Sequence, residues 1–199
     1  MPQPTSRTEI RRHPERGDHR DATVAAILDE GLVAHVGIAV DGQPYVIPMI
    51  YARRGATLYL HGSPASRLLR AMKKTVPVCV TVTLLDGLVL AKSAFHHSMN
   101  YRSVVVLGEA QEVTDPAEKR AAFAALVDHA VPGRSAEARP PNPKETAGTI
   151  VLALPLGEAS AKIRTGPPID DEADRPLPVW AGVIPLRLER GTPVPADGP

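Results

Sequence analysis

The chain has 199 residues, 43% of them hydrophobic and 23% charged, with a formal net charge of +1 at pH 7. This balance predicts a soluble globular protein, and the near-neutral charge gives no reason to expect nucleic acid or an anionic membrane as a partner. The single cysteine, Cys79, excludes an internal disulfide and a zinc cluster built on cysteines. No apolar run approaches the ~20 residues of a transmembrane helix, and the polar start lacks a signal-peptide core, so we expect a cytoplasmic protein.

Residues 1–20 mix proline, arginine, histidine and glutamate without periodicity. This is typical of a flexible or surface-lying N-terminal arm. One folded domain is expected over 21–190, followed by a C-terminal tail over 191–199 that is rich in proline.

The domain is predicted to open with a helix and a hairpin. Asp21 or Thr23 suits the helix cap, apolar residues follow at helical spacing, and Gly31 ends the helix. Asp41 and Gly42 then form a strong signal for a tight turn between two strands.

A strand, a turn and a short helix are predicted over 57–72. Apolar and polar-tipped residues alternate over 57–61, which indicates a strand with one buried face. Gly62 ends the strand, Ser63 suits a helix N-cap, and Pro64 suits the first helical position.

This turn also carries side chains suited to an anion. Backbone N–H groups at a helix start attract anions, and Ser63, Ser66 and Arg67 could close on a phosphate. The alternative is an ordinary capped helix with a solvated arginine, because such caps are common.

The rest of the chain is again mostly β. Asp86 and Gly87 predict a second tight hairpin turn. Gly108 is expected to form a bulge or a kink, and Asp115 to cap a helix. The predicted strands lie at 32–40, 43–51, 57–61, 76–84, 88–93, 101–114, 149–154, 159–165 and 179–188. Strands joined by tight turns, without βαβ alternation, predict a mainly β fold, an antiparallel barrel or sandwich with peripheral helices.

Several familiar site signatures are absent. The sequence has no glycine-rich dinucleotide turn, Walker loop, His-Glu-x-x-His or Gly-x-Ser-x-Gly motif. His96 and His97 are adjacent, so on a strand they would face opposite sides, and no metal site is predicted. The acidic residues at 170–172 lie among prolines and are expected to form a solvated loop.

Segments spread along the chain resemble, in their order, the pyridoxamine 5′-phosphate oxidase-like flavoproteins. These segments are 46–51, 58–63 with 66–67, 98–108 and 180–185. The resemblance extends over about residues 20–188 and is closest to the branch that includes nitroimidazole-resistance proteins. It implies a split β-barrel, a homodimer, and FMN bound in a groove between the two subunits.

The resemblance assigns site residues position by position. One group would hold the phosphate of FMN: Ser63, Ser66 and Arg67. Another would line the isoalloxazine ring through backbone contacts: Val46, Ile47 and Pro48.

Four further residues match positions near the flavin. Ser103 falls near the place of an oxidase glutamine, and Trp180 where the family has an aromatic residue, although a core or interface anchor is an equal alternative. Lys162 and Arg164 share one face of a predicted strand and could support the phosphate or the ring edge. The alternative for this pair is a solvated sheet face.

Two departures from the oxidases change the expected activity. Leu68 stands where the oxidases have a second cation, and their C-terminal substrate motif is missing, so oxidation of pyridoxamine phosphate is not expected. His61 matches a histidine of the nitroimidazole-resistance branch and could contact substrate or the flavin, or relay a proton. The alternative is that His61 has a structural role and forms hydrogen bonds at the mouth of the barrel. Because the relatives include haem binders, His61 or His96 is also a candidate axial ligand.

The function expected from these residues is that of an FMN-dependent oxidoreductase acting on a small planar acceptor, nitroaromatic or quinone-like. The sequence leaves haem or a deazaflavin open in place of FMN. A protein that binds haem or flavin without turnover is the first alternative, and a catalytically silent barrel dimer that acts through interactions is the second.

Overall fold

The computed structural model describes residues 5–73 and 76–196. Residues 1–4 of the expected arm and 197–199 of the expected tail lie outside the described residues. The chain divides into two units, Met1–Leu84 with Arg102–Ile163, and Leu85–Tyr101 with Arg164–Pro199. We describe each unit by itself.

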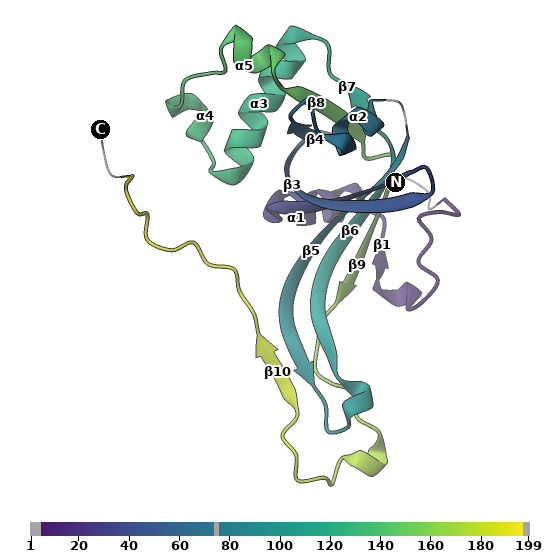
Figure 1. Ribbon diagram of the computed structural model, residues 1–199. Helices are drawn as coiled ribbons and strands as arrows, with labels where there is room; N and C mark the ends of the chain where they lie inside the picture. The colour runs from purple at the N-terminus through teal and green to yellow at the C-terminus, as the bar shows by residue number, and fades with distance from the viewer. Residues whose placement is uncertain (1–4, 74–75, 197–199) are drawn as a thin grey trace. The chain divides into compact units, whose positions relative to one another are not determined.

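The chain contains ten strands and five α-helices in the described residues (Figure 1). The strands are β1 Gly17–Asp18, β2 Val33–Val40, β3 Gln43–Arg54, β4 Thr57–Gly62, β5 Pro77–Leu90, β6 Ser98–Glu109, β7 Gln111–Glu112, β8 Ile150–Pro155, β9 Glu158–Arg164 and β10 Gly182–Pro185. The α-helices are α1 Asp21–Glu30, α2 Arg67–Met72, α3 Pro116–Ala130, α4 Arg134–Glu137 and α5 Pro143–Ala147. Three short 3-10 helices lie at Pro14–Arg16, Ala94–His96 and Glu172–Asp174. Within the described part of the chain, none of these helices has the length and apolar character to cross a membrane.

The ten strands form one connected sheet in the order β1–β9–β6–β5–β2–β3–β4–β8–β7, with β10 paired to β5. β3 joins its two halves, because it pairs with β2 through residues 43–50 and with β4 through 51–54. Both pairings are antiparallel, as are those of β4 with β8 and β7 with β8. The mainly β, antiparallel architecture with peripheral helices is therefore confirmed.

Both faces of β4 are buried. Leu58 and Leu60 point into the main core, where their side chains have no exposed surface. Tyr59, on the opposite face, packs with Val151 in a second cluster, and its hydroxyl donates to the Glu118 carboxylate of α3 at 2.9 Å. The expectation of one buried face was wrong, because α3 covers the side on which the sequence places Tyr59 and His61.

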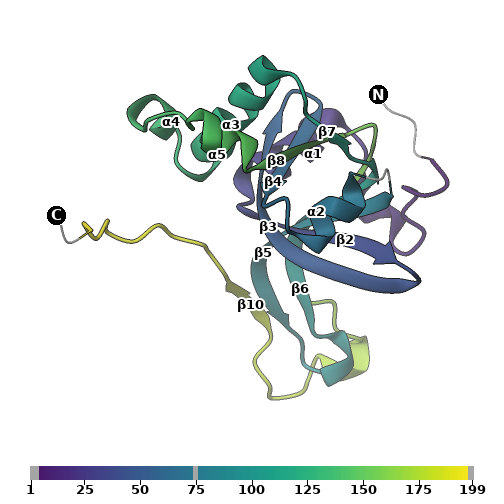
Figure 2. The same ribbon diagram turned by 45° about the horizontal axis from the view of Figure 1, so that its top comes forward.

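Four of the α-helices of the first unit lie in two places. In both views α3, α4 and α5 gather beside β4 and β8, and Figure 2 shows α2 next to the β2–β3 hairpin. The hairpin turn has positive φ angles at Asp41 (51°) and Gly42 (79°), as a tight primed turn requires, so this predicted turn is confirmed.

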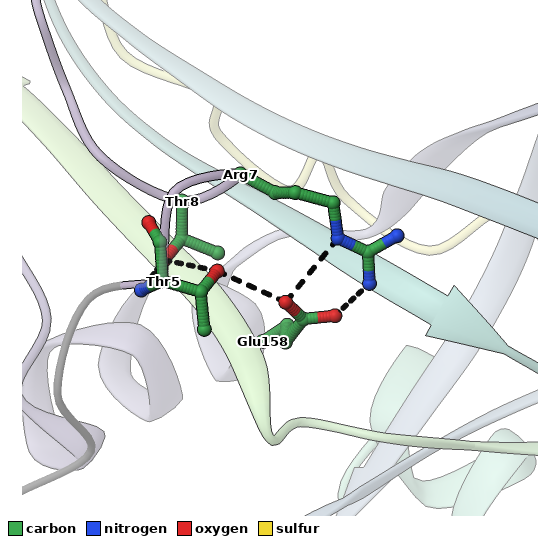
Figure 3. A network of polar contacts seen from close by, with 4 residues as sticks. All are labelled: Thr5, Arg7, Thr8 and Glu158. Atoms are coloured by element: carbon green, nitrogen blue, oxygen red, sulfur yellow. Dashed lines mark hydrogen bonds and ion pairs between the residues drawn. The ribbon is translucent and has the colours of Figure 1, made fainter.

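The segment before α1 lies against β9. The Thr5 hydroxyl donates to the Glu158 carboxylate at 2.9 Å, and the Arg7 guanidinium forms an ion pair with the same group (Figure 3). Lys162 Nζ donates to the Arg12 carbonyl at 2.8 Å, and β1 pairs with β9. These contacts hold residues 5–18 on the sheet.

The predicted hairpin at Asp86 and Gly87 was wrong. β5 runs through both residues without a turn, and Gly87 does not have the positive φ that a primed hairpin turn needs. β10 pairs along this stretch, with Gly87 opposite Pro185, and the Asp86 carbonyl accepts from Leu186 N at 3.0 Å. Pairing with a partner nearly a hundred residues away in sequence therefore keeps β5 continuous where the local sequence favours a turn.

The predicted strand over 101–114 is two strands. It breaks at Ala110, after which β7 pairs with β8, whereas β6 lies between β9 and β5. The break occurs two residues after Gly108, so the bulge was predicted close to the interruption. β10 is shorter than the predicted 179–188 and ends at Pro185.

Polar contacts hold the second unit together. Lys92 N donates to Asp170 Oδ1 at 2.7 Å, and its Nζ donates to the carbonyls of Leu177 and Val179. Among the described residues of this unit, the buried apolar side chains are Val89 and Ala91. The unit thus has few apolar residues in its interior.

Candidate cofactor-binding site

α2 begins at Arg67 and is capped by Ser66, whose Oγ accepts from Leu69 N at 3.4 Å. The predicted cap at Ser63, with Pro64 as the first helical residue, was wrong. Ser63 Oγ accepts instead from Ala65 N at 3.1 Å, and its carbonyl accepts from Ser66 N at 2.9 Å. Two serines close in sequence compete for the cap, and the first one closes a turn before the helix.

Arg67 is exposed and lies over a tyrosine ring. Its Nη1 donates to Tyr45 Oη at 3.0 Å, and its Cζ is 5.2 Å from the centroid of the Tyr45 ring. A guanidinium at this distance is attracted to the ring face. Tyr45 therefore orients Arg67, while the remaining N–H groups of the guanidinium can take an anion.

Two neighbouring hollows surround this pair. The first, which we call the charged pocket, has a volume of about 430 Å³ and is lined by Ala39, Val40, Asp41, Arg67, Arg70, Ala71 and Val76. The second, which we call the apolar pocket, has about 400 Å³ and is lined by Arg7, Gly37, Ile38, Ala39, Pro44, Tyr45, Val46, Pro77, Val78, Cys79 and Leu107. Ala39 lines both, and the hydrogen bond from Arg67 to Tyr45 joins a residue of one wall to a residue of the other.

The predicted ring-contacting residues lie on β3. Val46 is 65% exposed and lines the apolar pocket, opposite Gly37 of β2. Ile47 and Pro48 are exposed on the same strand but are not part of either pocket wall. The structure thus brings Val46 and Arg67 to adjoining hollows, whereas Ser63 and Ser66 line neither of them.

Ser103 and Lys162 are engaged with the chain itself. Ser103 Oγ donates to the Lys162 carbonyl at 3.3 Å, and Lys162 Nζ is bonded to the Arg12 carbonyl. Neither residue lines the two pockets. Their assignment to the flavin stays a prediction.

Arg164 and Trp180 belong to the second unit. Arg164 is only 7% exposed, and its guanidinium donates to Asn100 and to the carbonyls of Gly166 and Pro167. Trp180 is 62% exposed, so the core role considered for it was wrong, and roles beside a flavin or at an interface stay predictions.

His61 is half-buried on the same face of β4 as Tyr59, and it lines neither pocket. Among the described residues its Nδ1 is buried without a hydrogen-bond partner. Burial lowers the pKa of His61 below the ordinary 6.5, because the cation loses its hydration. The imidazole is therefore kept neutral, with a nitrogen free to bind a proton or a ligand.

This shift predicts a pH-dependent stability. The unfolded chain binds a proton at His61 at a higher pH than the folded chain does. The contribution of neutral His61 to the free energy of unfolding is therefore complete above about pH 6.5. It is lost as the pH falls through the lower pKa of the folded state. We expect His61→Gln to reduce the drop in free energy of unfolding between about pH 7.5 and about pH 5. Urea denaturation of both proteins at the two pH values measures it, and an equal drop in both would contradict the prediction.

The second histidine candidate is already paired. His96 Nε2 lies 3.2 Å from the Asp171 carboxylate, and the neighbouring His97 Nδ1 contacts the Ser93 carbonyl. Within the described residues, no group of three histidine, cysteine, aspartate or glutamate side chains could hold a metal ion.

Sequence reasoning missed three residues of the site. Arg70 had a local signal, since it lies one helical turn after Arg67 and shares its face. Tyr45 and Asp41 had none, because only the register of the β2–β3 hairpin and the position of α2 bring them to these pockets.

Residues 20–163 match the family model of pyridoxamine 5′-phosphate oxidase. The chain belongs to this family. The pyridoxamine 5′-phosphate oxidase fold is a flavin-binding split β-barrel, and this is the fold of the sheet described above. The resemblance inferred from the order of the segments is thereby confirmed.

Solved structures agree with this assignment. The flavocytochrome Anf3 from Azotobacter vinelandii is 43% identical, with 98% of this chain and 90% of that chain covered and a TM-score of 0.91. The FAD and heme binding protein from Mycobacterium smegmatis is 38% identical, with 92% and 89% covered and a TM-score of 0.87. A structure named as a 5-nitroimidazole antibiotic resistance protein, from Bacteroides thetaiotaomicron, shares the fold at 24% identity, with 74% and 86% covered and a TM-score of 0.63. Among curated proteins there is no match.

Proposed function

We propose that this pyridoxamine 5′-phosphate oxidase family member binds a flavin in the two adjoining pockets and works as an oxidoreductase on a small planar acceptor. One observation carries the proposal. Arg67, the residue that the family resemblance assigns to the flavin phosphate, lies on the wall of the charged pocket and is bonded to Tyr45 on the wall of the apolar pocket.

The residues fit the chemistry of a flavin. Arg67 offers charge-assisted hydrogen bonds to a phosphate, and Tyr45 fixes the direction of the guanidinium. Gly37, Val46 and the other apolar residues of the second wall suit a flat ring and keep water from one side of it. A bound flavin supplies hydride or single-electron transfer, while the protein supplies binding and orientation.

Absorption spectroscopy tests the proposal. The purified protein, or the apoprotein titrated with FMN or FAD, should show a bound-flavin spectrum. After anaerobic reduction, that spectrum should return on addition of a naphthoquinone or a nitroaromatic compound. A protein that binds no flavin would overturn the proposal, and one that binds flavin without reoxidation by either acceptor would support the alternative without turnover.

Haem is a second candidate ligand, on a specific observation. Two solved relatives above 35% identity are named as a flavocytochrome and as a FAD and heme binding protein. Of the two histidines considered as axial ligands, His61 has a buried nitrogen without a partner among the described residues, whereas His96 Nε2 is engaged by Asp171. We therefore propose His61 as the axial ligand of a haem.

Titration with hemin distinguishes the two histidines. The wild-type protein should develop a sharp Soret band, His61→Ala should lose it, and His96→Ala should keep it. A Soret band unchanged in His61→Ala would exclude His61 as the ligand.

We also propose that the protein is a homodimer. Apolar residues are exposed along β2 and β3, with Val33 and its cross-strand partner Ile50 on one face, at 49% and 38% exposure. In the described chain β4 pairs only with residues 51–54 of β3, which leaves one edge of 43–50 unpaired. Exposed apolar strands with a free edge are typical of surfaces that a partner covers.

Substitution on this face tests the dimer. We expect Val33→Asp combined with Ile50→Asp to convert the dimer into a monomer, since a charge would be buried in the interface. Light scattering after size-exclusion chromatography measures the mass, and circular dichroism checks the fold. Val131→Asp, at a residue 48% exposed just after α3, is the matched control and should stay dimeric. A wild-type monomer would contradict the proposal.

A further inference from the structure

We propose that residues 5–12 form a strap at the rim of the apolar pocket and that Glu158 latches it, so that the strap limits how fast a ligand enters and leaves this pocket. The inference rests on the proposed function only for the identity of the ligand. Access to the pocket can be measured without any flavin, because Cys79, the single cysteine of the chain, lies on its wall.

The strap supplies one part of the wall of the apolar pocket. The lining residues lie on β2, β3, β5 and β6, with the exception of Arg7. Gly37 pairs with Val46 on one side and with Cys79 on the other, and it has no side chain to fill the hollow between them. The sheet thus forms a fixed floor, and Arg7 is the part of the wall that can move away from it.

Glu158, at the start of β9, holds Arg7 in this position (Figure 3). Its carboxylate accepts from the Thr5 hydroxyl at 2.9 Å and from Arg7 Nε at 3.3 Å, and Arg7 Nη2 forms an ion pair with it. The hydrogen bond from Arg7 lowers the pKa of Glu158, so the carboxylate stays ionised at neutral pH. Glu158 itself does not line the pocket, and it therefore acts on the pocket through Arg7.

The other contacts of the strap are few and mostly polar. Among residues 5–12, Ile10 is the one large apolar residue, and it is only half-buried. The Arg7 side chain is 56% exposed, and ion pairs at such positions contribute little free energy. Further along, the Arg12 carbonyl accepts from Lys162 Nζ. Polar contacts of this kind allow the strap to open while the sheet stays folded.

The backbone at His13 separates the strap from the part of the chain that is fixed more firmly. His13 has a φ of 58°, in the left-handed region that is uncommon for residues other than glycine. After it come the 3-10 helix Pro14–Arg16 and β1, which pairs with β9. Opening of the strap would relieve the strain at His13 and leave the β1 pairing intact. We therefore place the hinge at His13.

Labelling of Cys79 with N-ethylmaleimide, a neutral thiol reagent, measures the opening in the full chain without added flavin. Glu158→Gln should speed labelling by about 3- to 10-fold, because it removes the ion pair with Arg7. Glu109→Gln is the matched control. Glu109 is exposed and its charge acts on Arg7, but among the described residues it forms no hydrogen bond or ion pair with the strap. This control should label at the wild-type rate.

Added salt provides a second test that needs no substitution. Salt screens an exposed ion pair, so labelling of the wild type should speed up between about 0.05 and about 0.5 M NaCl, and that of Glu158→Gln should change less. Arg7→Gln combined with Glu158→Gln should label no faster than Arg7→Gln alone, since both substitutions remove the same contact. Circular dichroism should show that the variants are folded. If Glu158→Gln does not fold, the salt response of the wild type decides.

The outcomes separate this inference from the proposed function. Labelling of Glu158→Gln at the wild-type rate, equal acceleration in Glu109→Gln, or a wild type insensitive to salt would overturn the strap. A flavin bound in the apolar pocket should slow labelling of Cys79, and it should dissociate faster from Glu158→Gln. Labelling that depends on Glu158 but is slowed by neither FMN nor FAD would support the strap and contradict the proposed flavin site. Slowing by flavin without dependence on Glu158 would leave only the proposed function standing.

Discussion

Arg67→Ala is expected to weaken binding of FMN and FAD by about 10- to 100-fold, because it removes a charge-assisted contact to the phosphate that both flavins share. The substituted side chain is exposed and follows the cap of α2, so the fold should be unaffected. Tyr45→Phe should cause a smaller loss, since it keeps the ring under the guanidinium and removes only the hydroxyl contact at 3.0 Å.

Flavin fluorescence quenching measures these affinities. Arg54→Ala is the matched control, because Arg54 is also exposed and lies at the end of β3, outside both pocket walls. Since the contact is ionic, the wild-type affinity should fall with added salt, and that of Arg67→Ala should fall less steeply. If Arg67→Ala bound both flavins as tightly as the wild type, the assignment of Arg67 to the flavin phosphate would be wrong.

Tyr51→Phe should lower the free energy of unfolding by about 2 kcal/mol, because buried polar groups lose a hydrogen-bond partner. Tyr51 has no exposed surface, and its hydroxyl lies 2.6 Å from the Leu28 carbonyl and 2.9 Å from that of Gly31. Burial raises the pKa of Tyr51, so the hydroxyl keeps its proton and stays a donor. The Gly31 carbonyl also accepts a hydrogen bond from His129 Nε2 at 2.6 Å. Removal of the Tyr51 hydroxyl should therefore affect the Leu28 carbonyl more than the Gly31 carbonyl.

Urea denaturation near neutral pH measures this change. Tyr59→Phe is a suitable comparison, because its hydroxyl contacts a single carboxylate, that of Glu118, which is exposed and can turn to water. We expect it to cost about 1 kcal/mol or less. A Tyr51→Phe protein as stable as the wild type would show that the two carbonyls find other partners.

Local patterns predicted the elements that local interactions determine. α3 begins directly after its predicted cap, Asp115, and the Asp41 turn formed, because caps and turn preferences act within a few residues. The predicted cap of α1 at Asp21 or Thr23 was wrong, because Asp21 is the first helical residue and Arg20 occupies the cap position without a side-chain cap hydrogen bond. The turn predicted at Asp86 did not form, because a long-range interaction determines the structure there. β10 pairs with β5 from far along the chain, and this pairing outweighs the preference of Asp-Gly for a turn.

The candidate site shows the same limit. Arg67 could be assigned to the candidate site because its motif is contiguous, and Val46 because it is part of a matching segment. The partner that orients Arg67, Tyr45, lies 22 residues earlier and is placed by hairpin register. From its alternation with Lys162, Arg164 was expected beside the flavin or on a solvated sheet face, yet it is buried with backbone carbonyls around its guanidinium.

The second unit has few buried apolar side chains, and it should therefore unfold locally more easily than the first unit. Once a segment detaches, water replaces hydrogen bonds to carbonyls, such as those from Lys92 Nζ, at little cost in free energy. Exposing large apolar side chains to water costs much more free energy. Amide hydrogens of 164–185 should therefore exchange with deuterium through local opening well before those of β4 and β8, whose leucines are fully enclosed. Any ligand or second copy that settles on Trp180 would slow that exchange and so report its own binding.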